Sequence, residues 1–183
     1  EHCEDLCFAG GKLYLSSGSC LYGVDLSSGR CEKFGPDFLE AEWLIDRPIY
    51  PIFPSGEQLF LGTALGVVTY NPETRVVGHL PGLEECNVNG FSRDGDTLLI
   101  STYAHGLVKY DLAGKEVVHF PDERQLLSLT GRRLNGVQKD DFGRVWVATG
   151  ESGVAVLEPG ETVRMLNSGS TFGALKSDNV RSI

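Results

Sequence analysis

The sequence NGVQKDDFGRVWVATGESGVAVLE, which spans Asn135–Glu158, decides the fold of this chain. An alternating run ends at two aspartates, Asp140 and Asp141, and a Phe-Gly turn leads into Arg144–Thr149. A second turn, which also contains glycine, leads into Gly153–Glu158. Alternation of apolar and polar residues between Gly and Asp turns is typical of antiparallel strands joined by hairpins.

The same pattern recurs three more times upstream. The corresponding strands all end in a hydroxyl residue and carry an aromatic residue or Leu three positions earlier. They are Lys12–Ser17, Gln58–Thr63, Thr97–Thr102 and Arg144–Thr149. Successive terminal hydroxyls are 46, 39 and 47 residues apart. Another strand follows each of them after four or five residues and ends in Asp, Asn or Glu, which suit the turn that comes next.

Each repeat also contains a strand after this pair and a strand before it, so the unit has four strands. Its period of roughly 40 to 50 residues is the range of propeller blades. A four-stranded meander has two apolar faces that it cannot cover alone, and stacking units face to face buries both faces. Small or hydroxyl residues in the repeat would allow neighbouring units to approach each other closely. We therefore predict an all-β fold, a β-propeller of four-stranded antiparallel blades. A β-sandwich is the alternative, but it does not need four copies of one strand–Gly–strand unit.

The predicted blades span approximately residues 2–35, 48–81, 87–121 and 133–167. Residues 177–183 resemble the first strand of another blade, because Asn179-Val180 matches Asn87-Val88. A propeller must close on itself or leave bare edges. We therefore expect this 183-residue chain to be part of a larger propeller. The alternative is a small closed propeller in which residues 179–183 pair with the N-terminal blade.

Charge and hydropathy argue against several classes of protein. The formal net charge is −9 and the isoelectric point is about 4.9. Nucleic-acid binding needs a basic face, and an anionic membrane surface also attracts basic segments, so neither partner is expected. No apolar run reaches the roughly 18 residues that a membrane span needs. Long helical periodicity is absent, and only residues 37–43 and 123–129 could form a helical turn or two.

The cysteines give no metal-binding pattern. There are five of them: Cys3, Cys7, Cys20, Cys31 and Cys86. An odd count leaves at least one unpaired within this chain. No CxxC is present, and Cys3 and Cys7 have no partner pair at zinc spacing. Buried free thiols within strands are the favoured interpretation, and one bridge near the N-terminus is the alternative in an oxidising compartment.

No catalytic motif is present either: the sequence contains no nucleophile elbow, no HExxH and no phosphate-binding loop. Asp94, Asp140 and Asp141 precede Gly turns, where an Asx-type turn is favoured over a metal ligand or a general base. His79 and His119 occupy equivalent places on separate predicted blades and would not converge on one site. We therefore expect no catalytic residue, no metal and no cofactor in this segment.

Aromatic residues in predicted loops are the candidates for ligand binding. Trp43, Tyr103 and His105 could stack on a sugar ring, and Tyr50 is a further aromatic of this kind. Tyr103 and His105 lie in the turn between the second and third strands of their blade, a place with access to one propeller face. Trp146 lies in the middle of a strand and is expected in the core.

Residues 134–158, followed by residues 175–183, resemble the two-component regulator propeller repeat. That repeat reads Asn-x-Val, then Asp-x-x-Gly-x-hydrophobic-Trp-hydrophobic-x-Thr, then Gly-hydrophobic and an aromatic-Asp pair. The residues that fit it here are Asp140, Gly143, Trp146, Thr149 and Gly153. The first blade departs from the pattern with Tyr14 and Ser17, and Leu99 replaces the aromatic residue in the third. The resemblance spans the whole chain and is specific in its last third.

In that family, such repeats form the large extracytoplasmic sensor region of hybrid two-component systems, notably in gut bacteria that degrade polysaccharides. The resemblance implies a non-catalytic, periplasmic ligand-recognition segment that responds to a carbohydrate, in a parent protein that is a histidine kinase. The implied partners are an oligosaccharide or another small ligand, the other blades and domains of the same chain, and a second copy in a homodimer. Nucleic acid and direct membrane contact are not expected for this segment.

Two alternative functions stay open. A propeller enzyme, such as a lyase or a glycosidase, would carry its site at the central channel, with a cluster of acids or His there. A general protein-interaction propeller is the other alternative, but neither the WD signature nor the kelch Gly-Gly signature is present. The sequence does not give the ligand, the total number of blades, the cysteine pairing or the oligomeric state.

Overall fold

A computed structural model describes residues 2–34, 48–118, 133–160 and 162–183. These residues form strands, turns and loops, and none of them forms a helix that could span a membrane. The two predicted helical turns, together with Trp43 and His119, lie outside the described residues.

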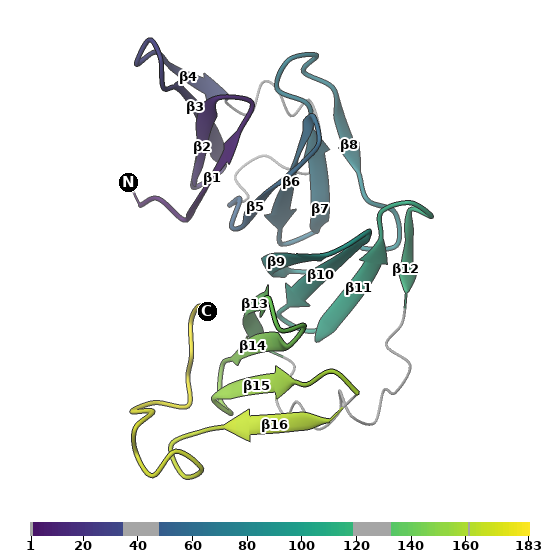
Figure 1. The fold of residues 1–183 in the computed structure, drawn as a ribbon. Coiled ribbons are helices and arrows are strands. Elements are labelled where there is room, and N and C mark those ends of the chain that lie inside the picture. The colour runs from purple at the N-terminus through teal and green to yellow at the C-terminus, as the bar shows by residue number, and fades with distance from the viewer. Residues whose placement is uncertain (1, 35–47, 119–132, 161) are drawn as a thin grey trace. The chain divides into compact units, whose positions relative to one another are not determined.

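The strands form four antiparallel sheets, each a meander of four strands in sequence order (Figure 1). We call these sheets blades 1 to 4. Blade 1 contains β1 (Asp5–Ala9), β2 (Lys12–Ser17), β3 (Cys20–Asp25) and β4 (Cys31–Phe34). Blade 2 contains β5 (Ile52–Ser55), β6 (Gln58–Thr63), β7 (Gly66–Tyr70) and β8 (Val77–His79). Blade 3 contains β9 (Val88–Asp94), β10 (Thr97–Thr102), β11 (Leu107–Asp111) and β12 (Glu116–Val118). Blade 4 contains β13 (Leu134–Lys139), β14 (Val145–Thr149), β15 (Val154–Leu157) and β16 (Val163–Leu166).

The chain divides into two compact units, Glu1–Val88 and Asn89–Ile183. Blades 1 and 2 belong to unit 1. Blades 3 and 4 belong to unit 2, except for the first residue of β9. Each unit contains a hydrophobic core in which one blade packs against the next.

The core of unit 1 follows from the alternation of side chains along each strand. The register aligns Ile52, Leu61 and Val68 across three strands, so they share one face of blade 2, which we call face A. The opposite face of each blade, which we call face B, carries the residue three positions before the terminal hydroxyl. In blade 1 this residue is Tyr14, which lies opposite Cys7. The unit 1 core joins face B of blade 1 to face A of blade 2. Its buried members are Cys7, Tyr14, Leu21, Phe34, Ile49, Ile52, Leu59, Leu61, Val68 and Tyr70.

Unit 2 repeats this arrangement. Leu99 lies three positions before a terminal hydroxyl, as Tyr14 does, and it lies in one cluster with face A of blade 4. The blade 4 side of that cluster includes Val137, Val147 and Ala155, which the register aligns across β13, β14 and β15. Both units therefore bury face B of one blade against face A of the following blade, and such burial is the dominant favourable term in folding.

The terminal hydroxyl of the repeat closes the loop that follows it. Thr149 Oγ1 donates to the carbonyl of Gly153 at 2.9 Å and accepts from the N–H of Ser152 at 2.9 Å. Thr102 makes the same pair of bonds in blade 3, and Thr63 makes it in blade 2. Gly153 has a φ of 88°, and an added Cβ would lie 2.1 Å from the carbonyl oxygen of Leu166. Only glycine fits such a position.

The residue before each terminal hydroxyl is small and buried: Ser16, Gly62, Ser101 and Ala148. An added Cβ at Gly62 would lie 2.4 Å from Pro51 and 2.8 Å from Val88. Ser16 instead donates its hydroxyl to the carbonyl of Tyr50 at 3.1 Å. Close approach therefore limits the size of the side chain at this position.

Residues 177–183 were expected to begin another blade, and no strand is assigned to them. Their contacts nevertheless repeat those of an inner strand in unit 2. Asn135 donates its side-chain amide to the carbonyl of Val180 at 2.7 Å, as Asn89 does to that of Leu134 at 2.7 Å. Val180 thus occupies on blade 4 the position that Leu134 occupies on blade 3.

Replacing Thr149 with Val tests the loop-closing hydroxyl. The side chain is 1% exposed, and Val keeps its shape but neither donates nor accepts a hydrogen bond. We expect Thr149→Val to lower the free energy of unfolding by about 1 to 3 kcal/mol, because the buried polar partners in the loop lose their bonds. Chemical denaturation measures the difference. Thr149→Ser keeps the hydroxyl, so its free energy of unfolding should fall clearly less than that of Thr149→Val. An equal fall in both variants would contradict the role of the hydroxyl in closing the loop.

Candidate functional site

Tyr103 and His105 lie on the short loop between β10 and β11. Thr102 holds this loop at both ends, because its hydroxyl accepts from the N–H of His105 at 2.9 Å and its own N–H donates to the carbonyl of Gly106 at 3.0 Å. Tyr103 is 49% exposed, and His105 is exposed as well. The anchored loop therefore presents a phenol ring and an imidazole to solvent from a backbone of fixed shape.

Arg133, directly before β13, completes this group of side chains. Its guanidinium carbon lies 5.4 Å from the centre of the Tyr103 ring, a cation–π distance. The side chain of Arg133 runs along Gly150, where an added Cβ would lie 2.8 Å from its Cδ. Gly150 also donates its N–H to the carbonyl of Arg133 at 3.0 Å. We call Tyr103, His105 and Arg133 the Tyr103 site.

The Tyr103 site combines an aromatic ring with a guanidinium and an imidazole. A half-exposed aromatic ring supplies an apolar face of fixed orientation, which suits the C–H face of a sugar. The guanidinium supplies a planar set of donors for hydroxyl or carboxylate oxygens. The three side chains come from two blades of unit 2, so packing between blades 3 and 4 sets their geometry.

The other sequence-predicted candidates, Trp43 and Tyr50, are not among the described residues of unit 2. Trp43 lies outside the described residues. Tyr50 lies in unit 1, where its N–H donates to the carbonyl of Gly62 at 3.0 Å and its carbonyl accepts from Ser16. Sequence reasoning missed Arg133. The available signal was its position directly before an inner strand, at the same end of the sheet as the loop that carries Tyr103.

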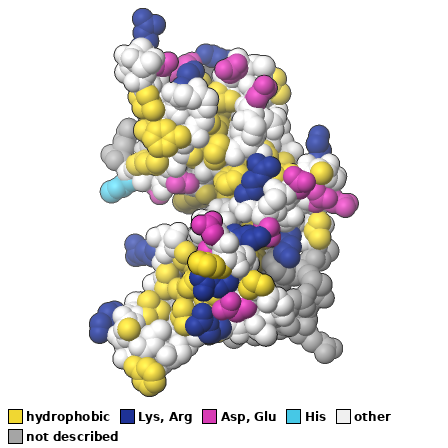
Figure 2. Space-filling view, viewed as in Figure 1, with side chains coloured by type: hydrophobic (Ala, Val, Ile, Leu, Met, Phe, Trp, Pro, Cys, Tyr) yellow, Lys and Arg dark blue, Asp and Glu magenta, His cyan; other side chains and the backbone are white. Residues whose placement is uncertain are grey.

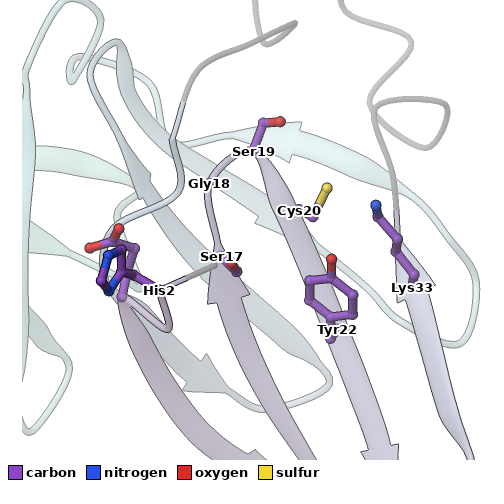
Figure 3. Close-up of a pocket in the computed structure, with 8 residues that line it drawn as sticks. His2, Ser17, Gly18, Ser19, Cys20, Tyr22 and Lys33 are labelled. Carbon is purple, nitrogen blue, oxygen red and sulfur yellow. The ribbon is translucent and has the colours of Figure 1, made fainter.

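Unit 1 has a hollow of about 390 Å³ at one end of blade 1 (Figure 3). The residues that line it are His2, Glu4, Ser17, Gly18, Ser19, Cys20, Tyr22 and Lys33. The Lys33 ammonium lies 5.7 Å from the centre of the Tyr22 ring. Figure 3 shows these two side chains next to each other on neighbouring strands, with the Cys20 thiol nearby.

Asp140 organises the turn between β13 and β14. One carboxylate oxygen accepts from the N–H groups of Phe142 at 3.0 Å and Arg144 at 2.9 Å, which makes the expected Asx-type turn. The other oxygen accepts from Arg144 Nε at 2.7 Å and Trp146 Nε1 at 2.8 Å. Both oxygens of Asp140 are therefore used within the turn.

The expectation that Trp146 lies in the core is only partly right. Its side chain is half-buried, and the Arg144 guanidinium carbon lies 5.2 Å from the centre of its ring. The indole N–H needs a hydrogen-bond partner, and Asp140 supplies one near the surface. This bond gives a physical reason for the spacing between Asp and Trp in the repeat.

Asp140 also predicts how stability depends on pH. Desolvation raises its pKa, but the bonds from Trp146, Arg144 and Phe142 outweigh that effect, and the pKa is lowered from 3.8 to about 2. A carboxyl group with a depressed folded-state pKa contributes stability that is fully present above about pH 4 and is lost as the pH falls toward about 2. Asp140→Asn should therefore be less stable than the parent at neutral pH, and the difference should shrink between pH 4 and pH 2.

Unfolding curves at several pH values test this dependence. Asp141→Asn is the matched control, because Asp141 is the exposed neighbouring carboxylate. Its effect on stability should be small. If the difference in stability between Asp140→Asn and the parent stays constant down to pH 2, the charge of Asp140 is unimportant for stability.

The remaining candidates are Asp94 and the five cysteines. Asp94 forms an ion pair with Lys139, and no group of three metal-ligating side chains occurs among the described residues. All five cysteines are free. Cys7 and Cys86 are buried thiols, as the sequence favoured, and burial, followed by the nearby Asp5, raises the pKa of Cys7 to about 11. Cys3 and Cys31 are exposed, which the sequence did not indicate.

Comparison with solved structures identifies the fold as that of a β-propeller. The chain is similar to the extracellular domain of a proposed one-component system from B. thetaiotaomicron, with a TM-score of 0.78, 18% identity and 99% of this chain covered. It is also similar to the extracellular domain of a proposed hybrid two-component system from B. thetaiotaomicron, with a TM-score of 0.75, 15% identity and 98% coverage. The Pan2 WD40 domain of Neurospora crassa matches 90% of the chain, and the chain covers 49% of that structure, with a TM-score of 0.63 and 11% identity.

These likenesses confirm the predicted all-β propeller fold, and they include the class of protein whose repeat the sequence resembles. The chain spans 24% and 23% of the two extracellular domains from B. thetaiotaomicron. No protein-family model and no curated protein matches the chain.

Proposed function

We propose that this chain is a non-catalytic segment of the extracytoplasmic, periplasmic sensor region of a hybrid two-component signalling protein, and that it recognises a carbohydrate. The Tyr103 site is the observation that carries the ligand-binding part of this proposal. The repeat pattern around Trp146 and the likeness in fold to extracellular domains of such systems support the signalling part. The parent protein in this proposal is a histidine kinase that acts as a homodimer.

The chemistry of the Tyr103 site favours a sugar as the ligand. A pyranose ring has an apolar C–H face that can stack on the half-exposed ring of Tyr103, and its hydroxyls can accept from Arg133. His105 adds a group that can donate or accept at the edge of the same surface. Because Thr102 already fixes the loop, little conformational entropy is lost when a ligand binds, and this favours affinity.

Signalling through this segment would work by a shift in an equilibrium. A ligand changes the population of two states only by as much as its affinity for them differs. The Tyr103 site contains residues of two adjacent blades, Tyr103 from blade 3 and Arg133 from the start of blade 4. A ligand that contacts both would favour the arrangement of these blades in which Tyr103 and Arg133 lie at the right spacing. In our proposal, this preference is passed to the rest of the sensor.

Substitution of Tyr103 tests the proposed ligand site in the full-length sensor. We expect Tyr103→Ala to weaken binding of the activating oligosaccharide about tenfold, which corresponds to about 1.4 kcal/mol, because the stacking surface is lost. Tyr103→Phe keeps the ring and should bind nearly as well as the parent. Isothermal titration calorimetry against a panel of oligosaccharides measures the affinities.

Phe172→Ala is the matched control, because Phe172 is a fully exposed aromatic residue of the same unit, 99% exposed, and lies outside the site. Its affinity should equal that of the parent. If Tyr103→Ala binds every oligosaccharide as tightly as Phe172→Ala does, the Tyr103 site is not the ligand site.

A further inference from the structure

We propose that the Tyr103 site selects a sugar that carries a carboxylate, such as a uronic acid, and that Arg133 is the residue that recognises this group. This selectivity rests on the proposed function, because it names the class of carbohydrate that the same site would bind. Three observations support it: the fixed place of the Arg133 side chain, the donors that this place leaves open, and the distribution of charge along the chain.

The side chain of Arg133 is held in place although it is exposed. Its guanidinium carbon lies 5.4 Å from the centre of the Tyr103 ring. Closer to the backbone, its Cδ and Cγ would lie 2.8 and 3.1 Å from a Cβ added at Gly150, so the stem of the side chain runs directly over that glycine. A long side chain normally loses rotamer freedom when it binds a ligand. Arg133 has lost part of this freedom before a ligand arrives.

The contact with Tyr103 leaves the N–H donors of the guanidinium open. A cation–π contact is an attraction to the ring face, whereas the five N–H groups of a guanidinium form a planar fork. Among the described residues, Arg75, Arg144 and Arg164 pair with carboxylates at 2.6, 2.7 and 3.3 Å. No ion pair joins Arg133 to a carboxylate of those residues. Its fork is therefore available to a carboxylate of a ligand, which can accept two parallel hydrogen bonds from it.

The net charge of −9 does not argue against an acidic ligand at this site, because the charge is unevenly distributed. Unit 2 contains 11 of the 16 Lys and Arg residues and has a formal net charge of −1, whereas unit 1 has a net charge of −8. Figure 2 shows Lys and Arg side chains over blades 3 and 4, among acidic and hydrophobic ones. Unit 2 by itself therefore presents its guanidinium without a large opposing charge.

The spacing within the site suits a sugar acid. In a hexuronic acid the carboxylate is attached directly to the sugar ring, so a ring that stacks on Tyr103 keeps its carboxylate near the guanidinium of Arg133. His105, exposed on the same loop, can donate a further hydrogen bond. Hydrogen bonds to an ionised acceptor are roughly twice as strong as those between neutral groups. The site should therefore prefer the acid to the neutral sugar of the same shape.

Calorimetric titration of the full-length sensor with matched pairs of sugars tests the selectivity. The probes are short oligosaccharides of galacturonic, glucuronic or mannuronic acid. Each is used as the free acid and as its methyl ester, which keeps the ring and removes the charge. We expect at least one free acid to bind, and its ester to bind about tenfold more weakly, because the charge-assisted hydrogen bonds are lost.

Three variants assign this preference to Arg133. Arg133→Gln should lower the affinity for the free acid about tenfold and leave the affinity for the ester nearly unchanged. Gly150→Ala keeps the charge, but its methyl group should displace Arg133 from the Tyr103 ring, so this variant should also lose affinity for the free acid and keep that for the ester. Arg93→Gln is the control. It removes the same charge from an exposed arginine of unit 2 next to the turn between β9 and β10, and it should change neither affinity.

Failure of the selectivity and failure of the proposed function give different results. If an ester binds as tightly as its acid, and Tyr103→Ala weakens this binding while Arg133→Gln does not, the site binds sugars and the assignment of a carboxylate is wrong. Equal losses of acid binding in Arg133→Gln and Arg93→Gln would show general attraction between charges and would also overturn recognition by Arg133. If no oligosaccharide binds, acidic or neutral, the proposed function fails and the selectivity fails with it.

Discussion

The burial of two faces of every sheet is the constraint on which this structure depends. A four-stranded meander is thin, and its alternating side chains make both of its surfaces apolar. In each unit, face B of one blade meets face A of the next, and this pairing determines where large and small residues stand. Tyr14 and Leu99 fill the contact, and Ser16 and Ser101 are the small buried residues on the same faces. The candidate residues Tyr103, His105 and Arg133 accordingly lie in a loop or directly before a strand.

The strand pattern could be predicted because its causes are local. Turn residues, alternation and the spacing of the terminal hydroxyls indicated four strands in each repeat, and packing followed from the two apolar faces. The role of the hydroxyls could not be predicted in the same way. A Thr at the end of a strand looks the same in sequence whether it points into solvent or closes a loop, and only the positions of Thr149 and Gly153 in space decide between these.

The candidate site was predictable only in part, for a related reason. Tyr103 and His105 could be placed on a loop, but the contact of Tyr103 with Arg133 depends on how two blades pack, and sequence gives no register between blades. The position of Trp146 shows another limit. An aromatic residue in the middle of a strand suggests a core position, yet the indole N–H of Trp146 needs a partner, and the side chain that donates to Asp140 is only half-buried. The polar atom, more than the ring, decides its environment.

The bonds of the terminal hydroxyls have a consequence for how such a protein can evolve. Thr63, Thr102 and Thr149 each secure a loop through the glycine carbonyl at its far end and one N–H just before it, and the side chains between them are not part of these bonds. Mutations there can change what the loop presents without disturbing the blade. One repeated scaffold can in this way carry different recognition groups at each copy, and the surface of the protein can diversify while its interior stays the same.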